Sequence, residues 1–264
     1  MSNIVYKIIV PTILFSVINY FPKIILRGAG VDFWSFLRDT LLGGSLWFTC
    51  ALAVSEILIG CILISRNNTI WFYLFSSVLL ALMGVLLAKL DIQLLGDKNI
   101  PWYYKSGMVA SLYLSFGGLY WKYETYMNTV LKGYRWLVLA VGYFLMMHLL
   151  QDNIQIVING GILNLTGFVT SITGVLMLIY CCKMLNNSKY ITWIGRHTLG
   201  LYFLSGGIPS LLSVVLTKFS VETVGGVSYL FLSVLSFIVG VIVVYLIDRF
   251  TPFIFDLRLL KEKI

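Results

Sequence analysis

Residues 226–248, GVSYLFLSVLSFIVGVIVVYLID, decide the fold class, because this stretch meets its first charged side chain only at Asp248. An apolar run of about 20 residues is long enough to cross a bilayer as a helix. The whole 264-residue chain has the same character, with 59% hydrophobic residues, 11% charged residues and a mean hydropathy of +0.91. Soluble domains carry about 25% charged residues. The composition therefore excludes a water-soluble globular protein, and also disordered, collagen-like and coiled-coil chains.

Seven further apolar runs precede this one, each bounded by charged residues, glycine, proline or asparagine. The sequence therefore predicts an all-α integral membrane protein with about eight transmembrane helices in one bundle, forming a single membrane domain over residues 1–264. The first run has no small-residue cleavage site at its end, so we expect a retained span rather than a signal peptide. The predicted spans are Ile4–Phe21, Ser45–Ile64, Ile70–Ala88, Trp102–Trp121, Tyr134–Leu150, Ile162–Cys182, Tyr190–Leu216 and Gly226–Asp248.

The distribution of the 19 lysine and arginine residues predicts the orientation of the spans. With the N-terminus inside, eleven of them fall on the cytoplasmic side and six on the opposite side, while Lys105 and Arg196 fall within spans. Because these residues collect on the cytoplasmic side of membrane proteins, both termini are expected in the cytoplasm of a multi-pass protein of a bacterial inner or plasma membrane. Topology thus accounts for the net charge of +8, and no nucleic-acid partner is predicted beside the lipid bilayer.

Three segments carry further structural signals. Val31–Leu42 is a short amphipathic stretch that is expected to lie in the membrane interface. Ile154–Ile158 is a strand-like run on the outer side, before a Gly-Gly break. The sixth predicted span has small residues three and four apart, which would let a neighbouring helix approach closely. These small residues are Gly167, Thr170, Ser171 and Gly174.

Ionisable side chains within the predicted spans are few, and each is a candidate for function because a charge in hydrocarbon is costly. Glu56 lies near the middle of its span, where it either takes part in function or forms a structural hydrogen bond to a neighbouring helix. Lys105 either extends outward to the interface or turns inward, where Glu56 would be a natural partner. His148 lies at the polar outer end of its span and is interpreted as a solvated or capping histidine rather than a catalytic one.

The most informative segment is residues 193–209, WIGRHTLGLYFLSGGIP. Its glycines and Pro209 predict a break in a helix that would otherwise run for 27 residues. His197, Leu201 and Ser205 are spaced by four residues, so they share one helix face and could line a cavity at the break. The alternative is that Arg196 simply marks the cytoplasmic border of the span.

Motifs of soluble enzymes are absent: the chain has no phosphate-binding glycine loop, no His-Glu-x-x-His, no paired Cys-x-x-Cys and no Gly-x-Ser-x-Gly. With only two histidines, a histidine-rich metal site is excluded, so neither a metal nor a bound cofactor is predicted. The four cysteines stand in apolar surroundings and are interpreted as small buried hydrophobic residues. They are Cys50, Cys61, Cys181 and Cys182.

Three segments, in order along nearly the whole chain, carry a resemblance to a known family. The first is IIVPTILFS at residues 8–16, followed by GSLWF at 44–48; the second is IPW at 100–102, leading to FGGL at 116–119; the third is WIGRHTLGLYFL at 193–204. Together they resemble the acyltransferase-3 family of multispanning membrane acyltransferases, whose bacterial members often acetylate surface polysaccharides.

The resemblance implies a membrane O-acyltransferase. Such an enzyme would move an acetyl or other acyl group from a cytoplasmic acyl-CoA co-substrate, most simply acetyl-CoA, to a sugar hydroxyl of a cell-surface glycan or its precursor. A base must take the proton of the hydroxyl, and cations must hold the phosphates of the donor. The candidate bases are His197 and Glu56. The candidate substrate and donor contacts are Arg196, Trp47, Lys105, Tyr202 and Ser205.

The chain also departs from the family pattern. Family members usually begin with two further helices that carry an arginine and a histidine, and Met1 falls about where the third helix would begin. Ser205 stands where the family often has a histidine. We therefore expect a fragment of a longer reading frame, a degenerate member, or a chain that completes its site with another subunit. The oligomeric state is left open.

Two other functions are compatible with the pattern. A transporter or flippase component of envelope polysaccharide assembly is the main alternative, because a broken span and a mid-span carboxylate such as Glu56 are typical of transport pathways. A glycan polymerase or ligase is the least favoured, since the outer loops are short.

Overall fold

The computed structural model describes residues 4–27, 32–43, 46–65, 70–95, 101–130, 135–149, 165–184, 188–205, 207–218 and 226–255. These residues form helices joined by turns, with no β-strand among them, so the predicted all-α architecture is confirmed. The chain divides into two compact units. The first unit comprises Met1–Cys50 and Lys189–Ile264, and the second comprises Ala51–Ser188.

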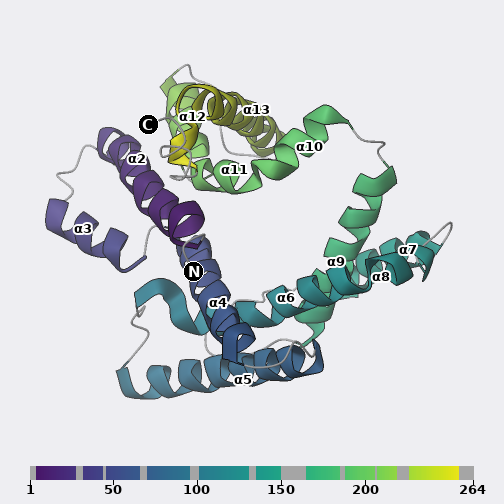
Figure 1. Cartoon of the computed structure of the whole chain (residues 1–264). Coiled ribbons are helices and arrows are strands. Elements are labelled where there is room, and N and C mark those ends of the chain that lie inside the picture. The colour runs from purple at the N-terminus through teal and green to yellow at the C-terminus, as the bar shows by residue number, and fades with distance from the viewer. Residues whose placement is uncertain are drawn as a thin grey trace. The chain divides into compact units, whose positions relative to one another are not determined.

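Each of the eight predicted spans contains helical structure, and seven correspond to one main helix each (Figure 1). The seventh predicted span differs, because it is divided into α10 (Lys189–Arg196), α11 (Thr198–Leu204) and α12 (Ile208–Lys218). The other spans contain α2 (Val10–Arg27), α4 (Trp47–Ser65), α5 (Ile70–Leu95), α6 (Tyr104–Lys122), α8 (Arg135–Leu149), α9 (Leu165–Met184) and α13 (Gly226–Phe250).

Two helices are long and apolar enough to cross a membrane as they stand, and they cover Ile70–Ala88 and Ser228–Phe250. A third candidate is the pair Thr198–Leu204 and Ile208–Thr217, whose two members are bent by 45° from one another. The structure thus supports membrane association through two or three spanning helices. Shorter apolar helices cover Val5–Tyr20, Trp47–Leu63, Arg135–Leu145 and Phe168–Lys183.

A π-helical turn precedes the proline of the N-terminal helix. The π-helical turn η1 (Val5–Ile9) precedes α2, and the N–H of Val10 donates to the carbonyl of Val5. Pro11 follows and has no N–H of its own, so it cannot complete the usual i to i−4 ladder. A local π-turn is a known way for a helix to absorb such a disruption without ending.

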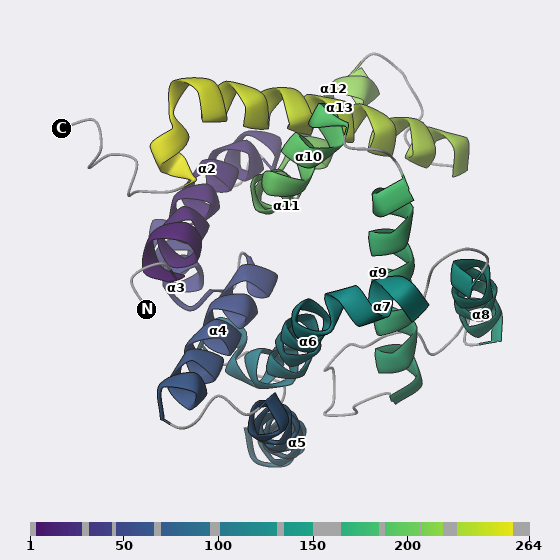
Figure 2. The ribbon, with the colours of Figure 1, turned by 45° about the vertical axis from the view of Figure 1, so that its right-hand side comes forward.

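Stacked phenylalanines lie at the centre of the core of the first unit, together with aliphatic side chains. Phe15 of α2 stacks on Phe203 of α11 with ring centroids 4.6 Å apart and on Phe255 at 5.6 Å. Phe255 follows the short 3₁₀ turn η3 (Pro252–Ile254) at the end of α13. Figure 2 shows α13 running beside α12, which it contacts. Phe15 and Phe203 are almost fully buried, so this unit has a dense core even though most of α13 is exposed.

Glycines make the close contacts of α6 with its neighbours α5 and α4 in the second unit. A Cβ at Gly84 of α5 would come within 2.9 Å of both the carbonyl oxygen of Lys105 and the Cβ of Met108 in α6. A Cβ at Gly107 of α6 would lie 2.7 Å from the Val54 side chain of α4. Both glycines therefore permit backbone approaches that a larger residue would prevent, as in helix pairs within membranes.

The small-residue stripe of the sixth span also has the predicted role. A Cβ at Gly174 in α9 would lie 2.7 Å from the ring of Tyr143 in α8, and α8 and α9 contact one another. Thr170 is buried as well. The prediction that this stripe admits a neighbouring helix is confirmed at Gly174.

Two short helices lie outside the predicted spans. The helix α3 (Phe33–Leu41) forms within the stretch predicted to be amphipathic, with the Asp32 side chain accepting a hydrogen bond from the N–H of Trp34 at 3.1 Å. Phe33 and Trp34 are 59% and 72% exposed, as expected of a helix in a membrane interface. The helix α7 (Glu124–Val130) was not predicted. The strand-like run Ile154–Ile158 lies outside the described residues.

The prediction for the cysteines is wrong in part. All four thiols are free, but only Cys50 is buried, whereas Cys61 and Cys182 are exposed and Cys181 is half-buried. An apolar sequence context predicts contact with something apolar, which in a membrane helix can be lipid instead of protein.

Candidate functional site

The break between α11 and α12 lies where the sequence predicts it. Asn19 of α2 forms a hydrogen bond to the backbone at this break. The side-chain amide of Asn19 donates to the carbonyl of Phe203 at 2.8 Å, across 184 positions of sequence. A Cβ at Gly207 would lie 2.6 Å from Oδ1 of Asn19, so the glycine leaves room for this amide. Asn19 is 9% exposed, and its hydrogen bond therefore forms inside the unit.

Two further carbonyls at the end of α11 also have partners within the chain. The carbonyl of Tyr202 accepts hydrogen bonds from the N–H of Ser205 at 3.1 Å and from its hydroxyl at 2.7 Å. The carbonyl of Leu204 accepts from the N–H of Gly207 at 3.1 Å. A broken helix exposes backbone groups that need partners in an apolar medium. Here the protein itself supplies them.

A second break separates α10 from α11 at His197, so the prediction of one helix running from Tyr190 to the glycines is wrong there. The N–H of His197 donates to the carbonyls of both Trp193 and Ile194, at 3.2 and 3.1 Å. The hydroxyl of Thr198 donates to the carbonyl of Gly195 at 2.9 Å. These bonds cap the last carbonyls of α10, which allows the helix to stop at the residue before His197.

Both ring nitrogens of His197 face oxygen atoms. Nδ1 lies 2.8 Å from the carbonyl oxygen of Trp193, and Nε2 lies 3.3 Å from Oδ1 of Asp248 on α13. A carbonyl oxygen can only accept, so Nδ1 carries a proton. Nε2 is therefore the nitrogen that can exchange one, and the carboxylate of Asp248 faces it.

The surroundings of His197 hold its ring in place. The indole of Trp193 stacks on the imidazole with centroids 4.3 Å apart and planes inclined by 25°. Phe255 approaches edge-on at 6.3 Å. The His197 side chain is 19% exposed and that of Asp248 38%. Aromatic rings thus hold the imidazole in place, and its Nε2 faces the Asp248 carboxylate.

Two arginines flank this pair in sequence. Arg196 ends α10 and is exposed. Arg249 follows Asp248 on α13, where its guanidinium lies 3.5 Å from the Tyr245 hydroxyl and 6.0 Å from the Phe250 ring. The ring of Tyr245 in turn lies 6.0 Å from that of Trp193. The turn at His197 and the end of α13 therefore each carry an arginine next in sequence to one member of the His197–Asp248 pair.

The remaining candidates of the first unit lie around α11. Tyr202 is half-buried, and its ring lies 5.0 Å from that of Phe48. Trp47, at the start of α4, is 53% exposed and makes an edge contact with Phe48 at 6.0 Å. Ser205 is exposed at the far end of α11 from His197, a separation of eight residues or about 12 Å along the helix axis. Phe48 thus links two of the predicted contact residues.

Glu56 and Lys105 belong to the second unit. Glu56 is half-buried on α4, next to the fully buried Ser55. Nζ of Lys105 lies 5.9 Å from the centroid of the neighbouring Tyr104 ring. Among the described residues no ion pair joins Glu56 to Lys105, so the partnership considered from the sequence is not formed. His148 belongs to α8, but its side chain lies outside the described part of the structure.

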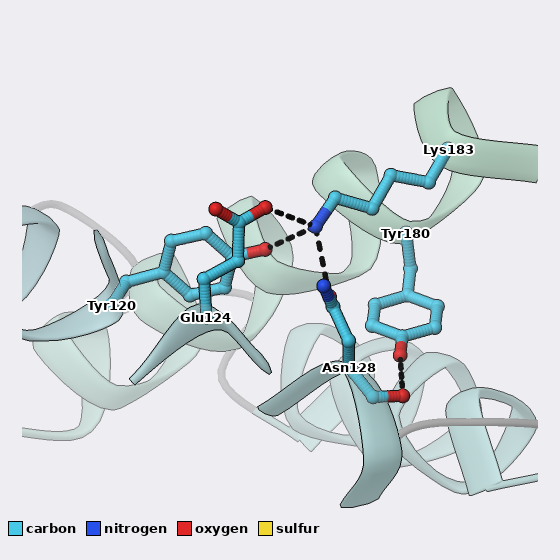
Figure 3. Close-up of polar contacts among 5 residues, drawn as sticks. All are labelled: Tyr120, Glu124, Asn128, Tyr180 and Lys183. Carbon is cyan, nitrogen blue, oxygen red and sulfur yellow. Dashed lines mark hydrogen bonds and ion pairs between the residues drawn. The ribbon is translucent and has the colours of Figure 1, made fainter. Parts of the chain in front are cut away.

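A polar cluster that the sequence did not predict joins α6, α7 and α9 in the second unit (Figure 3). Nζ of Lys183 donates to Oε1 of Glu124 at 2.7 Å, to Oδ1 of Asn128 at 2.8 Å and to the Tyr120 hydroxyl at 3.0 Å. The Tyr180 hydroxyl donates to the backbone carbonyl of Asn128 at 2.8 Å. The sequence contained two signals for this cluster. Lys183 lies just beyond the sixth apolar run, and Glu124 is the first residue of the short helix α7.

The charges in this cluster stabilise one another. The hydrogen bond from Lys183 and its positive charge hold the pKa of Glu124 below its usual value. Burial alone would lower the pKa of Lys183, but its hydrogen bonds to Glu124 and Tyr120 outweigh that effect and raise it. All three acceptors of the ammonium group come from the protein. The cluster is therefore a structural contact between α6, α7 and α9 rather than an open ligand site.

Within the described residues, no three histidine, cysteine, aspartate or glutamate side chains gather as metal ligands would. Comparison with known proteins adds no relative: no protein-family model matches the chain, and neither a curated protein nor a solved structure does. Any assignment of function therefore depends on the residues and geometry described above.

Proposed function

We propose that the chain crosses the membrane eight times with both termini in the cytoplasm, and that it acts as an O-acyltransferase. Its donor would be acyl-CoA, most simply acetyl-CoA, and its acceptor a sugar hydroxyl of a cell-surface glycan or precursor. The topology is supported by helical structure at all eight apolar runs and by the excess of lysine and arginine on one side. The activity is supported by the sequence resemblance and by one geometric observation.

That observation is the pairing of His197 with Asp248 at the turn between α10 and α11. The bond from Nδ1 to the Trp193 carbonyl fixes the tautomer, which leaves Nε2 as the basic nitrogen. A carboxylate 3.3 Å from Nε2 would stabilise the imidazolium that forms when Nε2 takes a proton. For Nε2 to act as a general base in acyl transfer, the sugar hydroxyl must enter between Nε2 and Asp248, because the carboxylate faces the same nitrogen.

The reaction can be written with these groups. Nε2 of His197 accepts the proton of the sugar hydroxyl while the hydroxyl oxygen attacks the thioester carbonyl carbon. The carbon–sulfur bond then breaks, and the sulfur of the donor leaves as a thiolate, which takes the proton from His197 and departs as the free thiol. Arg196 and Arg249 supply positive charge for the phosphates of the donor. Trp47, Tyr202 and Ser205 offer aromatic surface and a hydroxyl for the acceptor sugar.

The test is acyl transfer in membranes that contain the full chain. Labelled acetyl-CoA and a carbohydrate acceptor are supplied, and label in the glycan is measured for the wild type, for His197→Gln and for Lys122→Gln. General acid–base catalysis contributes about 100-fold or more, so His197→Gln should lose at least that factor. Lys122→Gln, an exposed lysine at the end of α6, should keep full activity. Equal activity of the wild type and His197→Gln would contradict the proposal.

The second candidate is a transporter or flippase component of envelope polysaccharide assembly, which Glu56 favours. A half-buried carboxylate without an ion pair among the described residues is expensive in a membrane helix. This function predicts substrate accumulation in proteoliposomes that collapses with Glu56→Gln, without any covalent product. Loss of acyl transfer in Glu56→Gln with no change in flux would instead make Glu56 the catalytic base and exclude transport.

A further inference from the structure

The helix α10 stands apart from the spanning helices in its amphipathic character. Tyr190 is 82% exposed and Ile191 40% exposed, and with the half-buried Ile194 they form one apolar side of the helix. Lys189 and Arg196 are seven residues apart on the opposite side, and both are exposed. An exposed helix with one apolar and one cationic side is typical of a segment lying in a membrane interface.

The structure fixes this helix as a separate element. The capping bonds of His197 and Thr198 end α10 before α11 begins. On its inner side, Trp193 stacks on His197 and meets the ring of Tyr245 on α13. Trp193 therefore attaches the helix to the first unit, while the side chains of Tyr190 and Ile191 are exposed.

The charge of α10 is entirely positive. The sequence KYITWIGR contains a lysine and an arginine and no acidic residue. Asp248, which faces this region from α13, is paired with His197. Arg249 adds a further cation at the end of α13. A surface of this kind is complementary to negatively charged phosphate groups, and each lysine or arginine near an anionic bilayer adds to its attraction.

We propose that α10 lies in the plane of the membrane surface and binds anionic phospholipid. Tyr190 and Ile191 enter the boundary of the acyl chains, and Lys189 and Arg196 hold the headgroup phosphates. Residues 189–196 are then an interfacial helix that precedes the seventh span instead of its first two turns. This inference does not depend on the proposed acyltransferase activity; with Arg196 on a headgroup phosphate, Arg249 remains for the phosphates of the acyl donor.

The experiment uses the full chain in vesicles of phosphatidylcholine and phosphatidylglycerol in equal amounts. Tyr190 is replaced by photoreactive p-benzoylphenylalanine, and the masses of lipid adducts are measured after illumination. Each nearby cation is worth about fivefold in local occupancy, so phosphatidylglycerol adducts should exceed phosphatidylcholine adducts at least fivefold. Lys189→Gln with Arg196→Gln should bring the ratio close to one, while Lys189→Arg with Arg196→Lys should keep the preference.

A matched probe at Leu230 on α13, which is 69% exposed, controls for the reagent. It should give lipid adducts without headgroup preference. The proposal is overturned if the probe at residue 190 gives no lipid adduct while the probe at residue 230 does. It is equally overturned if the ratio at residue 190 follows the vesicle composition in the chain with both cations present.

Discussion

Helices pack in two different ways in the two units of this chain. In the second unit, α5 and α6 are unbroken and meet through small residues such as Gly84 and Gly107. In the first unit, α11 is a short helix that is separated by a break from α10 on one side and from α12 on the other. Stacked phenylalanines and the amide of Asn19 hold it in place. An intact helix satisfies its own backbone and needs only a close-fitting neighbour. A broken helix needs specific donors and acceptors from other elements, and such positions can present polar side chains to a substrate.

The largest effect is expected from filling the glycine contact of the second unit. In Gly107→Leu, the new side chain would meet Val54 at 2.7 Å and the carbonyl of Ala51 at 2.9 Å, so α4 and α6 must move apart. Overpacking of this kind costs about 3 kcal/mol. The measurement is the thermal unfolding of purified protein in detergent, with the fraction of monodisperse protein as a second readout.

The matched control is Gly117→Leu in the same helix, because a Cβ at Gly117 meets nothing within 4 Å. It should leave the unfolding temperature nearly unchanged, since it adds apolar surface where no described residue is in contact. If both substitutions shift the unfolding temperature equally, close packing at Gly107 is not what holds this unit together.

A smaller effect is expected from removing the amide that closes the break in the first unit. Asn19→Leu leaves the carbonyl of Phe203 without its donor inside the unit, a loss of about 1–2 kcal/mol. Ile18→Leu, one residue away on an exposed position, serves as the control. The measurement is again thermal unfolding.

A double substitution tests whether Asn19 and Gly207 act together at this break. Gly207→Ala should destabilise the wild-type chain, because the new Cβ would lie 2.6 Å from Oδ1 of Asn19. In an Asn19→Ala background this clash is absent, so Gly207→Ala should cost much less there. Additive effects of the two substitutions would show that Asn19 and Gly207 do not act together.

The smallest effect is expected at the exposed ion pair of Glu124 and Lys183 in the second unit. Since the pKa of Glu124 is held below its usual value of 4.5, its pairing with Lys183 contributes stability that is fully present above that pH. The contribution is lost as the pH falls through the lowered pKa. The raised pKa of Lys183, whose usual value is 10.5, keeps the cation in place at all lower pH. Amide hydrogen exchange of α7 measures the result.

We expect the protection of α7, corrected for intrinsic exchange rates, to be constant in the neutral range and to fall in acid. Glu124→Gln should give the lower protection in the neutral range, because its amide cannot pair with Lys183 as a carboxylate does, and the difference from the wild type should disappear in acid as Glu124 becomes protonated. A wild-type protection that is independent of pH down to strongly acidic conditions would contradict the role of this ion pair.

The sequence predicted most of the fold because apolar runs and their boundaries are local features. The runs at residues 70–88 and 226–248 became helices, and the break near Pro209 appeared where glycine and proline weaken the helix. Gly174 has the close contact that its small-residue spacing predicted. Each of these signals is contained within about 20 residues, which is the length scale of a span.

The parts that the sequence did not reveal depend on long-range contacts. Asn19 and Phe203 are 184 positions apart, and Asp248 pairs with a histidine 51 positions earlier, so no local pattern marks either contact. The turn at His197 was also missed, because the side-chain and backbone bonds that end α10 are made by residues that are common inside helices. The pairing of Lys183 with Glu124 joins two helix ends that the sequence separates by 59 positions.

The most direct test of the account is a double-mutant cycle on acyl transfer, with His197→Gln, Asp248→Asn and the two combined. If Asp248 acts through His197, each single substitution lowers kcat/KM and the combined substitution is no worse than His197→Gln alone. Wild-type rates that persist in His197→Gln, or independent losses that multiply in the double variant, would contradict the account.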